Sequence, residues 1–156
     1  MNKLPTLMQE VERYIPNLEQ TTAAVSSSPV GWHLEHLLLV INQVVENIKQ
    51  SDPANFKKKF SFWKTIIFIT KKIPRGRVKA PAVVVPESAS TETSIKDALH
   101  KAVSAVKELE TLSANHYFKH PIFGYLNVKT TFQFLAIHTH HHLAIVKDII
   151  KNGQQA

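Results

Sequence analysis

An apolar stripe at helical spacing near the C-terminus constrains the fold more than any other feature of this chain. Its members recur every three or four residues: Val128, Phe132, Leu135, His138, His142, Ile145 and Ile149. Such spacing places side chains on one face of an α-helix. Two of the seven are histidine, at positions where a helix packed in a core normally carries leucine or isoleucine. Because a buried imidazole is costly unless it finds a partner, the stripe predicts a buried helix with a polar site inside it.

The two histidines belong to the run His138-Thr139-His140-His141-His142. Residues four apart stand one turn apart on one face, about 6 Å along the helix axis, so His138 and His142 could bind one divalent ion. Thr139 follows His138, so the run is not the H-E-x-x-H motif of metalloproteases. His140 and His141 point progressively away from the stripe, and we expect them at its solvated rim.

A second histidine pair precedes the first by about a hundred residues and supplies the candidate third ligand. His33 and His36 lie in the first turns of a strongly apolar segment, and His36 shares a helical face with Val40 and Gln43. We therefore expect His36 to point inward. Three imidazoles and a water would form an open site suited to zinc, nickel or another transition ion. The alternative is that His36, His138 and His142 are core histidines joined by hydrogen bonds.

The fold class follows from the long apolar runs and the scarcity of glycine, of which the chain has four. Helical spacing predicts four main helices, over residues 4–18, 30–49, 91–109 and 127–152. Pro16 should bend or shorten the first helix, and Ser28 should be the N-cap of the second, with Pro29 at its first position. We expect Thr91 to lie at the start of the third helix and Asn127 to cap the last.

The connection between the second and third helices is long. Residues 56–73 suggest a shorter helix, and residues 74–90 contain three prolines and a glycine, with residues 82–85 expected to be extended. Residues 115–125 should form a turn, because His120 before Pro121 favours extended backbone and Phe123-Gly124 favours a turn under the last helix. These elements predict one all-α domain over residues 1–156, a four-helix bundle with a long crossover between helices 2 and 3.

Several classes of protein are excluded by composition. The chain has no cysteine, which rules out disulfides and thiolate-bound zinc. Residues 1–20 lack the apolar core of a signal peptide, and the apolar stretches are interrupted well before about 18 residues, so we expect no membrane span. A cytoplasmic protein is the expectation.

The net charge of +7 comes from one segment. Residues 57–79 hold nine of the 19 basic residues and no acidic ones, which leaves the rest of the chain at −2. Lysines interleaved with Phe60, Phe62 and Trp63 could bind phosphates, as in a nucleic-acid or anionic-membrane module. No recognised nucleic-acid motif accompanies them, so we do not expect nucleic acid as a partner. A weaker form of this hypothesis is that the segment guides an anionic substrate toward the metal.

Three short motifs, in this order and spacing, resemble the DinB-like superfamily. They are Trp32-His33-Leu34-Glu35-His36-Leu37, His120-Pro121-Ile122-Phe123-Gly124-Tyr125-Leu126 and His138 through His142. The resemblance covers nearly the whole chain. It implies an antiparallel four-helix bundle with a right-handed crossover, and a homodimer. It also implies a metal bound by one histidine of the second helix and the H-x-x-x-H pair of the last, which here are His36, His138 and His142. His33 stays an alternative to His36.

The function implied by this resemblance is that of a divalent-metal-dependent enzyme acting on a small molecule. Some relatives are transferases or isomerases that use bacillithiol or mycothiol, a low-molecular-weight thiol that the metal activates, and others are described as metal-dependent hydrolases. The alternative is a non-catalytic helical module that binds metal, or that binds polyanions through residues 57–79. Conceivable acid–base groups are Glu35, Glu46, Tyr125 and His120, and none is predicted to be catalytic.

Overall fold

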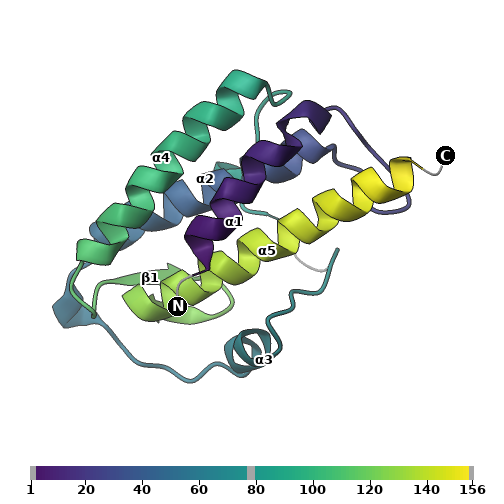
Figure 1. Ribbon diagram of the computed structural model, residues 1–156. Helices are drawn as coiled ribbons and strands as arrows, with labels where there is room; N and C mark the ends of the chain where they lie inside the picture. The colour runs from purple at the N-terminus through teal and green to yellow at the C-terminus, as the bar shows by residue number, and fades with distance from the viewer. Residues whose placement is uncertain (1–2, 77–79, 155–156) are drawn as a thin grey trace.

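The computed structural model describes residues 3–76 and 80–154, and its secondary structure is mostly helical. Four helices pack along a common core: α1 (Leu4–Val11), α2 (Val30–Lys49), α4 (Glu92–Thr111) and α5 (Val128–Gly153). Helix α2 lies against both α4 and α5, and α1 lies against α5 (Figure 1). We call these four helices the helical body. The all-α prediction is therefore broadly confirmed.

The ends of these helices follow local sequence signals. Thr91 caps α4 through a reciprocal pair of hydrogen bonds with Ser94, and the Asn127 side chain accepts the N–H of Thr130 at the start of α5, as expected. Helix α1 ends at Val11 and continues as the 3-10 helix η1 (Glu12–Asn17), which contains Pro16. Because proline has no N–H to donate within a helix, it shortens the α-helical part.

The start of α2 differs from the sequence prediction by one residue. Pro29 itself is the N-cap, and Ser28 lies outside the helix, where its N–H donates to Ser26 Oγ. Gly31 in the first turn lies close to the chain entering α4, since a Cβ there would approach Ser90 Cβ to 2.9 Å. The absence of a side chain at Gly31 lets the segments before α2 and α4 meet.

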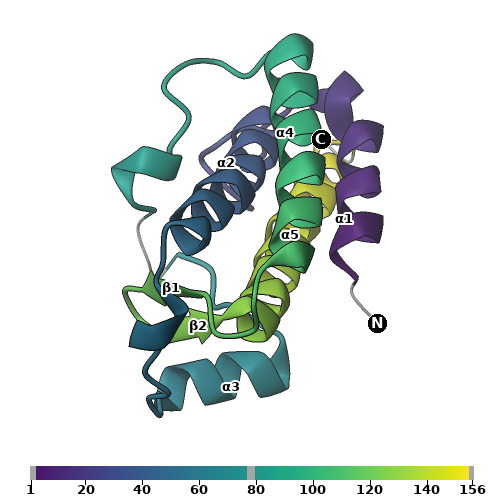
Figure 2. The same cartoon turned by 90° about the vertical axis from the view of Figure 1, so that its left-hand side faces the viewer.

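The crossover between α2 and α4 contains short helices rather than extended chain. It runs through η2 (Pro53–Asn55), α3 (Phe62–Thr70) and η3 (Ala82–Val84). The prediction of an extended segment at residues 82–85 was wrong, because Val84 and Val85 donate their N–H groups to Pro81 and Ala82 and form a 3-10 turn. Helix α3 lies crosswise at one end of the helical body (Figure 2).

The predicted turn before α5 is a β-hairpin, which the sequence analysis missed. Strands β1 (Tyr117–His120) and β2 (Gly124–Asn127) pair antiparallel, with His120 opposite Gly124. Gly124 has φ +71°, a left-handed conformation that glycine adopts without strain. His120 is extended and Phe123 is buried against Phe134 of α5, as expected. The hairpin places the N-terminus of α5 against the core.

The described residues contain no helix that is both long and apolar enough to cross a membrane.

Candidate metal centre

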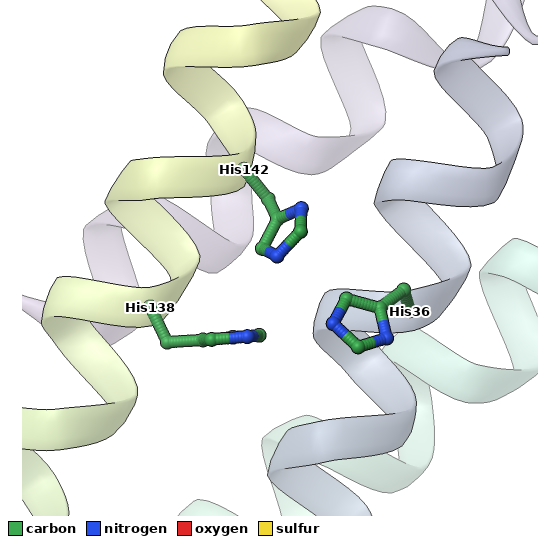
Figure 3. Close-up of side chains that lie close together, drawn as sticks. All are labelled: His36, His138 and His142. Carbon is green, nitrogen blue, oxygen red and sulfur yellow. The ribbon is translucent and has the colours of Figure 1, made fainter. Parts of the chain in front are cut away.

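Three histidines that lie far apart in the sequence converge between α2 and α5. His36 extends from α2, and His138 and His142 extend from successive turns of α5 into the same space (Figure 3). One ring nitrogen from each lies within 4.8 Å of the other two. The ring centroids are 4.6 Å apart for His36 and His142, 4.6 Å for His138 and His142, and 5.2 Å for His36 and His138. The predicted trio is therefore brought together by the fold.

The hydrogen bond of His36 fixes its tautomer. Its Nδ1 lies 2.7 Å from the carbonyl oxygen of Val84 in the crossover. A carbonyl only accepts, so Nδ1 must carry the hydrogen and donate it, which leaves the Nε2 lone pair free. Histidines that bind metal commonly donate their other ring N–H to a carbonyl or a carboxylate. The crossover thus orients His36 as a metal ligand requires.

A chain of hydrogen bonds connects His142 to the segment before α2. His142 Nδ1 lies 3.1 Å from His33 Nδ1, and His33 Nε2 lies 3.0 Å from Ser26 Oγ. If His142 binds an ion through Nε2, its Nδ1 carries the hydrogen and donates to His33 Nδ1. His33 Nε2 then donates to the hydroxyl of Ser26. The His142–His33–Ser26 hydrogen bonds can be donated in either of two directions. Metal binding by His142 selects the direction that runs from His142 to Ser26.

His138 differs from the other two in its hydrogen bonding. The residue is half-buried, yet its Nδ1 is shielded from solvent and has no hydrogen-bond partner among the described residues. A polar atom buried in this way costs about 1–3 kcal/mol of desolvation. An ion bound by His138 through Nδ1 would give this nitrogen the partner that the described residues do not supply.

Burial keeps the imidazoles of the centre neutral. Desolvation lowers the pKa of His36, with the Val84 hydrogen bond opposing it, and lowers the pKa of His138 and His142 well below the usual value. The pKa of His33 falls to about 4. The main cause of this lower pKa is desolvation, and a smaller one is the repulsion that a protonated His33 would experience from His36 in its charged form. Neutral imidazole is the form that binds a metal ion. The donor set therefore fits a divalent transition ion at neutral pH.

The spacing of the nitrogens also fits after a small adjustment. Three nitrogens about 2.1 Å from a common ion in tetrahedral geometry stand about 3.4 Å apart. One nitrogen from each ring lies within 4.8 Å of the other two, so side-chain movements of about an ångström bring the nitrogens into range. Trp32 stacks on the His36 ring at 4.9 Å with planes 12° apart, and so supports that ring from one side.

The other sequence candidates lie elsewhere. Glu35 accepts a hydrogen bond from Ser94 of α4 at 3.5 Å, and Glu46 pairs with Lys49 on the surface. Tyr125 lies in strand β2, where its ring contacts that of Tyr117 at a tilt of 54°. His120 holds the hairpin turn, since its Nδ1 accepts the N–H groups of Ile122 and Phe123. In the described part of the chain, none of the four has a hydrogen bond or ring contact with the three histidines, although His120 lies near enough to His138 to interact with it electrostatically.

Sequence reasoning treated His33 only as a rival to His36, and it missed the role that the geometry gives this residue. His33 is buried, but it lies behind His142 rather than with the three converging nitrogens. The spacing i, i+3 on α2 is the signal that could have suggested a supporting position. The carbonyl of Val84 could not have been found, because a main-chain partner in a distant loop leaves no pattern in the sequence. His140 is exposed and His141 half-buried, as expected for the rim.

Comparison with known proteins identifies the family of the chain. The family model of the DinB superfamily matches residues 10–146, a range that includes both histidine pairs and the hairpin. Neither a curated protein nor a solved structure matched the chain. Since the family match spans most of the sequence, the chain belongs to the DinB superfamily.

Proposed function

We propose that this protein is a divalent-metal-dependent enzyme that acts on a small molecule, with His36, His138 and His142 as the metal ligands. The observation that carries the proposal is the convergence of three neutral imidazoles, with one nitrogen of each within 4.8 Å of the other two. One of these rings has a buried nitrogen without a partner among the described residues. Hydrogen-bonded core histidines would satisfy one another. His138 Nδ1 is left unsatisfied, and this favours a site for an ion.

The residues around the ligands would keep them in place. Val84 and His33 each bond the Nδ1 of one ligand and direct its Nε2 toward the ion, while Trp32 limits rotation of the His36 ring. With three protein ligands, a fourth position remains for water or substrate. An ion bound there lowers the pKa of a bound water or binds a thiolate as nucleophile.

The identity of the ion, the type of reaction and the assembly are inferred from the resemblance of the sequence to the DinB-like superfamily. Nitrogen-only ligation suits zinc or nickel, and these are the ions we propose. The reaction would be transfer to a low-molecular-weight thiol or hydrolysis of a small substrate. We also propose that the helical body is the antiparallel four-helix bundle of the superfamily and that two copies form a homodimer.

The first experiment measures metal content and affinity. The purified protein should bind one zinc or nickel ion per chain, and the double variant His138→Ala with His142→Ala should bind none. Matched controls are His140→Ala, which removes an exposed histidine from the same helix, and His116→Ala in the loop before β1. A protein that takes up no ion after gentle purification and metal addition would contradict the metal site.

A second experiment separates an enzyme from a metal-binding module. The metal-loaded protein is assayed with a panel of thiol-conjugation and ester or amide hydrolysis substrates, and the metal-free protein is the control. Turnover that depends on the metal supports the enzyme. Stoichiometric metal with a large increase in thermal stability, and no turnover across the panel, supports the non-catalytic module instead.

A further inference from the structure

Helix α3 is apolar on both of its faces, although only one face contacts the protein. Ile67 and Phe68 face inward, where Ile67 is buried and Phe68 packs against Phe123 of the hairpin loop. The opposite face carries Phe62, Ile66 and Ile69, which are spaced four and three residues apart and therefore lie in one row. We call these three residues the outer face of α3. A helix that is apolar all round is normally buried or in contact with lipid.

Two of the three side chains of this face are largely exposed, and Ile66 between them is half-buried. Phe62 is 62% exposed and Ile69 is 75% exposed, with Trp63 at 55% beside them and Phe60 at 83% just before the helix. Single exposed apolar residues are common on protein surfaces, but a contiguous apolar patch of large side chains marks an interaction site. Helix α3 lies crosswise at one end of the helical body (Figure 2).

Local interactions hold the helix in this position. The Ser61 side chain caps its N-terminus by accepting the N–H of Lys64, and its hydroxyl donates to the carbonyl of Ile122 in the hairpin loop. Lys71 ends the helix in a left-handed conformation, with φ 55°. The outer face is therefore presented by an ordered helix that is docked on the hairpin.

Both ends of this helix carry exposed lysines. Lys57, Lys58 and Lys59 precede it, and Lys71 and Lys72 follow it. In the described part of residues 53–86, the one ion pair joins Arg75 to Asp148 of α5, so these five lysines have no acidic partner. Arg77 and Lys79, which belong to the predicted basic segment, lie outside the described residues. The surface around α3 combines apolar side chains with uncompensated positive charge.

We propose that α3 and its flanking lysines bind the surface of an anionic lipid bilayer. The outer face would enter the boundary between headgroups and acyl chains, with Trp63 at headgroup level, while the lysines contact lipid phosphates. The charge complementarity of the lysines with an anionic surface identifies the partner. This inference does not depend on the metal centre.

Two other occupants fit the observations less well. A symmetric contact with a second copy would bring two positively charged segments together, with repulsion that nothing in this segment offsets. A single-stranded nucleic acid would stack its bases on aromatic rings, but Ile69, the most exposed residue of the outer face, has no π face. Aliphatic side chains in the row favour lipid.

The experiment is flotation of the full-length protein with vesicles of phosphatidylcholine alone and of phosphatidylcholine mixed with phosphatidylglycerol. We expect binding to the mixed vesicles, a blue shift of the Trp63 fluorescence that Trp63→Phe abolishes, and weakening by salt. Phe62→Ser with Ile69→Ser should reduce binding at least tenfold. Lys57→Gln with Lys58→Gln and Lys59→Gln should reduce it about 100-fold, because each lysine near the surface contributes to attraction.

Matched controls make the same types of substitution elsewhere on the surface, and so test whether the position in and around α3 matters. Val83→Ser removes an exposed apolar residue outside α3, and Lys101→Gln with Lys107→Gln and Lys151→Gln removes the same charge from α4 and α5. Both controls should bind the mixed vesicles within about twofold of the unchanged protein, since attraction falls off within a Debye length. Circular dichroism checks that each variant is folded.

Several results would overturn the proposal. They are no binding to the mixed vesicles, equal binding to both vesicle types, or an equal loss of binding in the controls. Tighter binding to single-stranded DNA than to vesicles, unchanged by Phe62→Ser with Ile69→Ser, would identify a nucleic-acid surface instead. A dimer in analytical ultracentrifugation that this same variant dissociates would identify a self-association surface.

Discussion

The metal centre and the outer face of α3 depart from the usual distribution of polar and apolar residues in opposite directions. His36, His138 and His142 place polar groups in the interior, where the neighbouring helical positions are leucine, isoleucine and valine. Phe62 and Ile69 place hydrocarbon in water. Sequences that fold well are consistent at all levels, and the exceptions concentrate at functional sites.

The two regions also differ in the groups that surround their unusual residues. In the interior, His33 and the carbonyl of Val84 are hydrogen-bonded to two of the three histidines, so that centre is organised before any ion binds. On α3, Phe62 and Ile69 of the outer face are exposed to solvent, and Ile66 is half-buried. We propose that a small ion completes the first region and that a large surface covers the second.

The largest effect should come from His138→Leu, which we expect to change metal affinity and stability in opposite directions. Affinity for zinc should fall by more than the roughly 100-fold that accompanies loss of an outer-shell partner. The metal-free protein should become more stable by about 1 kcal/mol, because leucine removes an unsatisfied buried nitrogen. Calorimetry and urea unfolding measure the two quantities.

His36→Leu is the matched control for that variant. It should lose metal binding equally, but it should destabilise the metal-free protein by about 1–3 kcal/mol, since the Val84 carbonyl loses its donor. If His138→Leu instead destabilises the metal-free protein as much as His36→Leu, His138 is a structural core histidine and the comparison fails.

The two faces of α3 should respond differently to truncation. Ile67→Ala, on the inner face, should cost about 2 kcal/mol of unfolding free energy, because Ile67 is 5% exposed and leaves a cavity. Phe62→Ser with Ile69→Ser should cost less than about 0.5 kcal/mol, since exposed positions contribute little to folding. Urea unfolding of both variants provides the test, and similar costs would show that the outer face is covered in solution.

His33→Phe should weaken metal binding about 10–100-fold, because it keeps the volume of the ring but removes the acceptor of the His142 Nδ1 hydrogen. His141→Phe is the control, since this half-buried histidine also lies beside His142 but has no hydrogen bond to it in the described part of the chain. Competition with a zinc indicator measures both affinities. Equal affinities in the two variants would show that His33 does not orient His142.

The smallest effect concerns pH and the hairpin. Burial lowers the pKa of His120 from 6.5 to about 4, so the unfolded chain takes up a proton below pH 6.5 while the folded protein does so only near pH 4. The stability associated with neutral His120 is therefore complete above pH 6.5 and is lost as the pH falls toward 4. Protonation would also occupy the Nδ1 that accepts from Ile122 and Phe123.

His120→Asn should reduce this loss, because its side-chain oxygen can accept the same N–H groups and does not titrate. The full shift corresponds to about 3 kcal/mol, and solvent screening of a half-buried ring lowers this to about 1–2 kcal/mol. Urea unfolding at pH 7 and pH 4.5 measures the difference between the variant and the unchanged protein. The same pH dependence in both would show that His120 does not contribute to acid sensitivity.

Much of the fold could be predicted because its signals are local. The Thr91 and Asn127 caps, the effect of Pro16 and the apolar stripe of α5 each act within a few residues of the chain. The hairpin was missed because four-residue strands give too short a pattern, and its stability depends on Phe123 packing against Phe134. The 3-10 turn at Val84 was read as extended, because consecutive valines favour strands unless a local turn prevails.

From the sequence alone it follows that the protein is helical, that a metal site in it cannot use thiolates, and that two histidines stand one turn apart on an apolar helical face. Helical periodicity and residue chemistry are sufficient for these conclusions. Only the tertiary structure decided that His36 joins them, that His33 supports His142, and that Phe62 and Ile69 of α3 are exposed. These depend on which distant segments pack together, and that is set by the whole core rather than by neighbours in sequence.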